Sequence, residues 1–259
     1  MFKLENHWLS LVIFTFSILI GLSGLNWGIP SSESLSFYPL NKFKESTTDV
    51  EIYQIGPLES LHPDEGNILN ALSNMKPSEF NFNPNFFNYP SFHIYLVGSI
   101  LKIGQVFNII ELKNNRDFYL KNPHEFGKLF SFGRLLSIFM GSLTAILLFY
   151  ISNNLFNKRV SIISPFVLLL TPLWVRNIHF MQVNVPLTFW TVLTIYFLTV
   201  YLKSKSANFL ILSSLASGIA TATKYTGSLF IFMPFLFFLK NREKSKVLCL
   251  KILCLPILV

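Results

Sequence analysis

The sequence contains several apolar runs, each close to the length that an α-helix needs to cross a membrane. A bilayer core is about 30 Å thick, and a helix crosses it with about 20 residues. No water is available there to hydrogen-bond the backbone, so only helices and closed barrels can span it. The runs predict an all-α polytopic membrane protein with spans at Trp8–Trp27, Ser131–Ser152, Val160–Val175, Asn184–Leu202, Asn208–Ala222 and Thr226–Leu239.

A further apolar run begins at Val247 and contains Cys249 and Cys254. Its 13 residues, up to Val259, are too few for a comfortable crossing. We therefore expect residues 1–259 to form a single membrane domain that is the N-terminal part of a longer protein. The first span is longer than the apolar core of a usual signal peptide, which favours a retained signal anchor. The two cysteines are expected to pack as small apolar side chains.

Composition supports this class of protein and excludes others. Hydrophobic residues make up 51% of the chain and charged residues only 13%, so its bulk partners are membrane lipids. The net charge of +8 does not indicate a nucleic-acid partner, because the basic residues form no single patch with interleaved aromatics. The sequence has no Gly-rich phosphate loop, so it does not indicate a site for a soluble nucleotide. The richness in Phe, Ile, Asn and Lys, without any Asn-x-Ser/Thr site, favours a prokaryotic plasma membrane.

The segment Tyr89–Phe107 decides the topology, since it could span the membrane but also suits a helix lying in the interface. If it lies flat, eight basic residues fall in later cytoplasmic loops and two, Arg176 and Lys224, in the short outer connections. That distribution agrees with the positive-inside rule. If the segment spans, the bias reverses unless the N-terminus is also outside. We prefer the flat reading, which makes residues 28–130 an extracytoplasmic loop with interfacial helices and residues 131–259 a transmembrane bundle.

With this topology, polar side chains from distant parts of the sequence approach the outer face. Their types, two acids, two cations and an amide, could serve one chemical site. We therefore predict a functional site formed by Asp64, Glu65, Arg134, Asn184 and Lys224.

The adjacent acids Asp64 and Glu65 have two readings. They follow Pro63, and an early Pro with acids in the first turn is typical of a helix start. Alternatively, they supply a general base that faces a lipid-linked substrate. Sugar transfer from a polyprenyl phosphate has an acidic leaving group, so it needs a base for the acceptor hydroxyl more than a general acid. On this reading Asp64 is the base and Glu65 supports the geometry or binds the acceptor.

The cations and the amide also have two readings. Arg134 and Lys224 stand at predicted span ends, where snorkelling to the interface is the ordinary role. Alternatively, they bind the phosphate of the donor and stabilise its charge as it leaves. Asn184 is either an N-cap or a hydrogen-bonding partner of the substrate. No His/Cys/Asp spacing is specific for a metal, although His62, His93 and His179 leave a divalent cation as an open alternative.

Four motifs then stand in a characteristic order: His62-Pro63-Asp64-Glu65, Asn88-Tyr89-Pro90, Gly133-Arg134-Leu135-Leu136-Ser137 and Ala222-Thr223-Lys224-Tyr225-Thr226-Gly227. Together they resemble those of lipid-linked glycosyltransferases with a GT-C-type membrane fold, a superfamily that includes the protein O-mannosyltransferases and the aminoarabinose transferases of lipid A. The resemblance covers nearly all of the chain, but no single motif is a strict signature. It implies a GT-C-like helical bundle and a polyprenyl-phosphate sugar donor.

The resemblance also implies roles for particular residues. It makes Asp64 the catalytic base and places His62, Asn88 and Tyr89 beside the substrate. The family commonly has an acidic residue at the start of a later span, where this sequence has Asn184. An amide hydrogen-bonds but cannot act as a base, so this chain departs from the family at this position. The family's C-terminal half is absent, and the sequence therefore leaves the acceptor unidentified.

Two other classes of function remain as alternatives. A flippase or transporter of lipid-linked sugars would place ionisable residues near the middle of spans. The expected spans carry their charges at the ends, which favours the enzyme. A non-catalytic membrane subunit that positions a partner enzyme is the second alternative.

Overall fold

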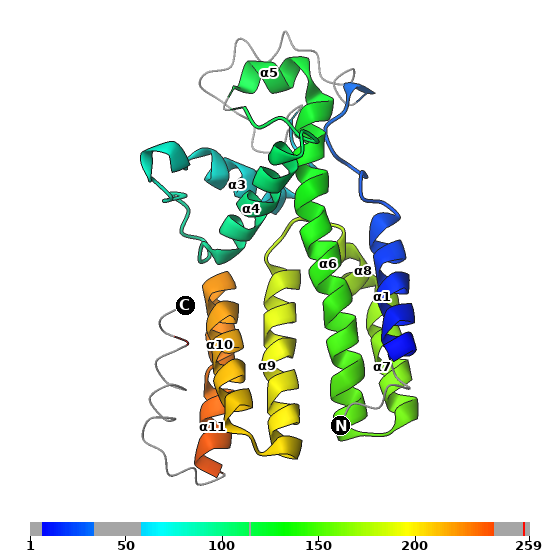
Figure 1. Cartoon of the computed structure of the whole chain (residues 1–259). Helices are drawn as coiled ribbons and strands as arrows, with labels where there is room; N and C mark the ends of the chain where they lie inside the picture. Colours follow the sequence, from blue (N-terminus) through cyan, green and yellow to red (C-terminus); the bar gives the residue numbers. More distant parts are fainter. Residues whose placement is uncertain (1–6, 34–57, 114, 241–255, 257–259) are drawn as a thin grey trace. The chain divides into compact units, whose positions relative to one another are not determined.

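The computed structural model describes residues 7–33, 58–113, 115–240 and 256, and these residues fall into two compact units. One unit consists of residues 1–23, 86–93 and 137–259, and the other of residues 24–85 and 94–136. The described part is helical, and its only β-type pairing is an isolated bridge between Lys76 and Asn81. The helices in Figure 1 are α1 (His7–Leu22), α3 (Pro63–Ser73), η3 (Pro77–Glu79), α4 (Phe92–Val106), α5 (Arg116–Lys121), α6 (Pro123–Leu155), α7 (Lys158–Leu170), α8 (Pro172–Ile178), α9 (Asn184–Ser204), α10 (Ala207–Thr223), η4 (Tyr225–Phe230) and α11 (Phe232–Lys240).

Two described helices, α6 and α9, are long and apolar enough to cross a membrane. They contain 33 and 21 residues. The spans predicted at 131–152 and 184–202 lie within them, so these two predictions are confirmed. The all-helical membrane fold expected from the apolar runs is confirmed with them.

The span predicted over Val160–Val175 corresponds to a bent pair of helices. Helices α7 and α8 meet at an angle of 68° and together pass the length and composition test for a span. The bend lies at Thr171, whose backbone is extended, with φ −71° and ψ 119°. Pro172 causes this, because a proline disfavours the helical conformation of the residue before it. The sequence analysis did not anticipate this bend, and whether the pair forms one span stays a prediction.

The remaining predicted spans form shorter apolar helices. Helix α1 has 16 residues and α10 has 17, fewer than the about 20 of a straight crossing. The run expected as one span over Thr226–Leu239 is divided into the 3-10 helix η4 and the α-helix α11. By length and composition, the described residues therefore contain two candidate spans, or three if the bent pair is counted as one. The run that begins at Val247 lies outside the described residues.

Helices α9 and α10 of the first unit pack closely through small and hydroxyl side chains. Ser213 and Ser217 of α10 are completely buried, and the Ser213 hydroxyl donates to the backbone oxygen of Thr194 at 3.1 Å. The turn into η4 is equally tight, because a Cβ added at Gly227 would lie 2.4 Å from backbone atoms of Ala220. Small residues allow helices to approach in this way where lipid, rather than water, surrounds them.

The second unit contains α3, α5, most of α4 and the first part of α6. Its apolar core includes Ile68, Leu69, Val97, Leu101 and Leu129. Helix α4 has 15 residues, about 22 Å of helix, which is less than the thickness of a bilayer core. Its predicted location in the membrane interface stays a prediction, as does the division into a loop of residues 28–130 and a bundle of residues 131–259.

Candidate functional site

Helix α3 begins within the Leu61-His62-Pro63-Asp64-Glu65 sequence, as the helix-start reading predicted. His62 is the N-cap, and its Nδ1 accepts a hydrogen bond from the backbone N–H of Asp64 at 3.3 Å. Pro63 is the first helical residue, where its missing N–H costs nothing. Asp64 and Glu65 follow in the first turn, where the helix dipole favours negative charge.

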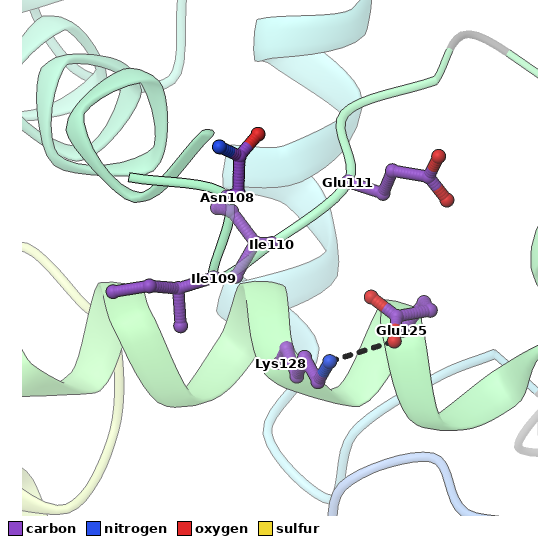
Figure 2. Close-up of a pocket in the computed structure, with 6 residues that line it drawn as sticks. All are labelled: Asn108, Ile109, Ile110, Glu111, Glu125 and Lys128. Carbon is purple, nitrogen blue, oxygen red and sulfur yellow. Dashed lines mark hydrogen bonds and ion pairs between the residues drawn. The ribbon is translucent and has the colours of Figure 1, made fainter. Parts of the chain in front are cut away.

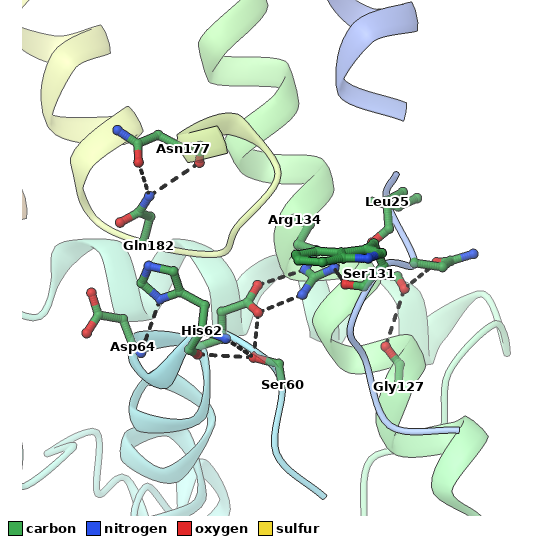
Figure 3. Close-up of polar contacts among 12 residues, drawn as sticks. Leu25, Ser60, His62, Asp64, Gly127, Ser131, Arg134, Asn177 and Gln182 are labelled. Carbon is green, nitrogen blue, oxygen red and sulfur yellow. Dashed lines mark hydrogen bonds and ion pairs between the residues drawn. The ribbon is translucent and has the colours of Figure 1, made fainter. Parts of the chain in front are cut away.

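Glu65 forms a buried, two-pronged ion pair with Arg134 of α6, and both belong to the second unit. Arg134 Nε donates to Glu65 Oε1 at 2.8 Å, and Nη2 donates to Oε2 at 2.7 Å. Both residues are 0% exposed. The Ser60 hydroxyl also donates to Glu65 Oε2, at 2.6 Å (Figure 3). This geometry joins the first turn of α3 to α6.

The remaining nitrogen of Arg134 binds the segment that follows α1. Nη1 donates to the backbone oxygens of Leu25 and Trp27, at 2.8 and 2.7 Å (Figure 3). Four hydrogen bonds thus engage the guanidinium, which has five N–H groups. A buried ion pair is tolerated when such additional hydrogen bonds satisfy its charges. Arg134 therefore fixes three separate segments of the second unit around one carboxylate.

Asp64 has different surroundings from its neighbour. Its side chain is half-buried, and within the described part of the chain its carboxylate accepts no hydrogen bond and forms no ion pair. Its backbone N–H donates to the His62 ring. The first turn of α3 therefore places two adjacent acids in different environments, one buried and ion-paired and one half-buried with no ion pair among the described residues.

This geometry bears on the role expected for Arg134. Binding of donor phosphate by Arg134 stays a prediction, but a phosphate would have to displace Glu65 from a fully buried guanidinium. Leaving a buried Glu65 carboxylate unpaired would cost several kcal/mol. In the structure, the Arg134 guanidinium binds the Glu65 carboxylate.

In the first unit, Asn184 and Lys224 are brought together. Lys224 Nζ donates to Asn184 Oδ1 at 2.9 Å, and Asn184 Nδ2 donates to Gln182 Oε1 at 2.9 Å. Gln182 Nε2 in turn donates to Asn177 Oδ1 at 3.0 Å. Within the described residues Lys224 has no carboxylate partner. Sequence reasoning missed Gln182 and Asn177, although both are polar residues flanking apolar helix and so carried a detectable signal.

The N-cap role considered for Asn184 is not observed. Asn184 is the first residue of α9, the cap is Val183, and no side chain caps the helix. The Asn184 carboxamide does not cap the helix because it forms other hydrogen bonds. Its oxygen accepts from Lys224, and its nitrogen donates to Gln182.

Asn88 and Tyr89, expected beside the substrate, lie in the first unit before α4. Asn88 is exposed, and Tyr89 is half-buried with its ring 4.8 Å from that of Phe86, centroid to centroid. The substrate-binding roles of His62, Asn88 and Tyr89 stay predictions. So does the convergence of Asp64, Glu65, Arg134, Asn184 and Lys224 on one outer face.

The histidines considered as metal ligands have other surroundings. Both ring nitrogens of His179 contact backbone oxygens, Nδ1 that of Val175 and Nε2 that of Ile20. His93 is fully buried, with neither ring nitrogen hydrogen-bonded within the described residues. The described residues hold no group of three or more His, Cys, Asp or Glu that could bind a metal ion.

The second unit also has an open depression of about 320 Å³, lined by Asn108, Ile109, Ile110, Glu111, Glu125 and Lys128 (Figure 2). Its charges are matched locally. Lys128 Nζ pairs with Glu125 at 2.7 Å, and Glu111 pairs with Lys113 at 3.0 Å. An anionic or cationic ligand would have to break these pairs, so this depression is a weaker candidate than the surroundings of Asp64.

Comparison with known protein families decides the class of the protein. The family model for dolichyl-phosphate-mannose-protein mannosyltransferases matches residues 126–259, just over half of the chain. The chain belongs to this family. It is therefore a membrane glycosyltransferase of the GT-C type, and a lipid-linked sugar donor and a membrane setting follow from that membership. No curated protein and no solved structure matches the chain.

Membership in the mannosyltransferase family confirms the GT-C resemblance inferred from the motifs. The matched region begins in the first turn of α6, includes Arg134, Asn184 and Lys224, and excludes Asp64 and Glu65. The general function as a glycosyltransferase is thereby established, whereas the sugar, the acceptor, the membrane face and the base are matters of proposal.

Proposed function

We propose that the protein transfers a sugar from a polyprenyl-phosphate donor to a hydroxyl of a lipid, glycan or protein acceptor, with Asp64 as general base. The reaction takes place at the extracytoplasmic face of a prokaryotic plasma membrane and inverts the configuration at the anomeric carbon. A single base suffices because the phosphate leaving group is already acidic.

One observation carries the proposal: α3 holds Asp64 and Glu65 in different environments. Glu65 is buried and bonded to Arg134, whereas the Asp64 carboxylate is half-buried and unpaired within the described residues. A helix-starting function alone would be served by either acid. The buried pair instead gives α3 a fixed starting point, so that the accessible carboxylate next to it is held rigidly. Rigid placement of a base is what proton transfer in a transition state requires.

In the proposed reaction, the acceptor O–H gives its proton to the Asp64 carboxylate, and the acceptor oxygen forms a bond to the anomeric carbon. The bond between that carbon and the phosphate oxygen breaks, and its electron pair leaves with the polyprenyl phosphate. Lys224 binds the phosphate and stabilises the charge that develops on it. Arg134 acts through Glu65 as a positioning residue.

The test is to incubate the purified full-length protein, in lipid nanodiscs, with a panel of polyprenyl-phosphate sugars and candidate hydroxyl acceptors. Products are identified by mass spectrometry, and their anomeric configuration by NMR. The proposal predicts transfer from at least one lipid-phosphate donor with inversion. Transfer with retained configuration, or transfer from nucleotide sugars alone, would contradict it.

A further inference from the structure

Lys224 is held at the end of a line of three amides. We call this series of side-chain hydrogen bonds the relay. Lys224 donates to Asn184, Asn184 to Gln182, and Gln182 to Asn177, with donor–acceptor distances of 2.9, 2.9 and 3.0 Å. Gln182 is 2% exposed, and Asn177, Asn184 and Lys224 are half-buried. The relay connects the end of α8, the start of α9 and the residue that follows α10, all within the first unit.

The direction of the relay is fixed by chemistry. An ammonium group has donors but no acceptor, so the Asn184 oxygen must face Lys224 and the Asn184 nitrogen must face away. The same reasoning then orients Gln182, whose nitrogen donates both to the Asn177 side chain and, at 3.5 Å, to the Asn177 backbone oxygen. Each carbonyl end therefore points toward the cation, which favours the positive charge without cancelling it.

Some lysines and arginines of the described residues form ion pairs with acids, which offset their positive charge. Arg134, paired with Glu65, is one of them. Lys224, in contrast, has no acidic partner within the described residues and donates to the uncharged Asn184 carboxamide. A half-buried cation that keeps its full charge attracts an anion more strongly than one already paired with a carboxylate.

We infer that Asn177, Gln182 and Asn184 are positioning residues that hold Lys224 in place as an uncompensated cation for the phosphate of the lipid donor. This inference rests on the proposed function, because it assumes that Lys224 is the phosphate ligand. The amide at position 184 is a departure of this chain from the acidic residue common in the family, and with it Lys224 keeps its full charge.

The chain offers both a sharp test and a matched control. In an Asn184→Asp variant the new carboxylate neutralises Lys224. Gln182 and Asn177 can turn their amides over and keep the side-chain hydrogen bonds, at the loss of the 3.5 Å contact between Gln182 and the Asn177 backbone oxygen. At the other end of α9, roughly 28 Å along the helix axis, Lys203 Nζ donates to Asn154 Oδ1 at 2.9 Å. The Asn154→Asp variant therefore introduces the same chemistry away from the proposed site.

The measurement is the binding of undecaprenyl phosphate, without any sugar, to the full-length protein in nanodiscs. We expect Lys224→Gln and Asn184→Asp each to weaken binding about tenfold or more, and Asn154→Asp to bind like the wild type. A Gln182→Leu variant, which breaks the relay without adding charge, should bind with intermediate affinity.

The outcomes separate the two ideas. If Lys224→Gln binds as tightly as the wild type, the proposed phosphate ligand is wrong. Lys224→Gln could instead lose affinity while Asn184→Asp and Gln182→Leu do not. That result would support Lys224 as the phosphate ligand and would contradict the positioning role of the amides. Equal losses in Asn184→Asp and Asn154→Asp would also overturn the relay, because the effect would then be one of overall charge.

Discussion

Glu65 and Arg134 are separated by 69 positions in the sequence, yet they meet in a fully buried two-pronged ion pair. The pair anchors the first turn of α3, and the next residue toward the N-terminus, Asp64, keeps a carboxylate that is unpaired among the described residues. The adjacent acids thus have distinct roles, one in holding the second unit together and one, as we propose, in catalysis.

Breaking this ion pair should destabilise the protein strongly. Glu65→Gln leaves the Arg134 charge buried without its partner, and removing one member of a buried pair costs about 3–5 kcal/mol. The thermal midpoint of unfolding should therefore fall by several degrees. The control is Glu79→Gln, which removes an exposed ion pair with Lys76 at 3.4 Å and should change stability by less than about 1 kcal/mol. Equal effects of the two variants would show that the buried pair is not an anchor.

Substitution of two glycines by alanine should change the stability of the protein in opposite directions. A Cβ at Gly227 would collide with backbone atoms of Ala220 at 2.4 Å, so Gly227→Ala must separate η4 from α10, at a cost of about 1–3 kcal/mol. A Cβ added at Gly66 of α3 would meet nothing within 4 Å, so Gly66→Ala should stabilise α3 by about 0.5–1 kcal/mol. Unfolding in detergent, followed by circular dichroism, measures both. A neutral Gly227→Ala variant would contradict the tight turn.

Stability should fall in mild acid because of His93. Burial lowers the pKa of His93 from its ordinary value of 6.5 to about 4. The unfolded chain therefore binds a proton between these values that the folded protein does not. The His93 contribution is fully present above pH 6.5 and decreases as the pH falls toward 4, by roughly 1.4 kcal/mol for each pH unit.

Thermal midpoints of the wild type and of a His93→Leu variant, measured from pH 7 to pH 4, test this prediction. The variant should have a flatter pH dependence over that range. His124→Leu, which removes an exposed histidine of α6, is the control. Parallel curves for the wild type and His93→Leu would mean that His93 is not buried in its neutral form.

The sequence predicted those parts of the fold that depend on local apolar length. Helices α6 and α9 were expected because their runs are long and uninterrupted, and the start of α3 was expected from Pro63 and the acids that follow it. The break between α7 and α8 was missed, although Pro172 within the run was a visible signal. The division of the last predicted span into η4 and α11 has no comparable local signal.

The partners within the candidate site could not be predicted in the same way. Hydropathy places Arg134 at the start of a span, but it does not show that Glu65 will occupy its guanidinium. Likewise, the sequence marks Asn184 as a helix-start residue, whereas Lys224 and Gln182 take up its side chain. The pairs Glu65–Arg134 and Asn184–Lys224 join residues that are far apart in the sequence, and no periodic pattern encodes them.

The most direct test of the account is the catalytic rate of an Asp64→Asn variant, measured with the active lipid-phosphate donor at saturating concentration. Asp117→Asn is the matched control, because Asp117 is also the second residue of its helix, α5, and is exposed. We predict that Asp64→Asn lowers kcat about a hundredfold or more, with the thermal midpoint unchanged, and that Asp117→Asn leaves kcat as it is. A kcat for Asp64→Asn equal to that of the wild type would contradict the role of Asp64 as the base.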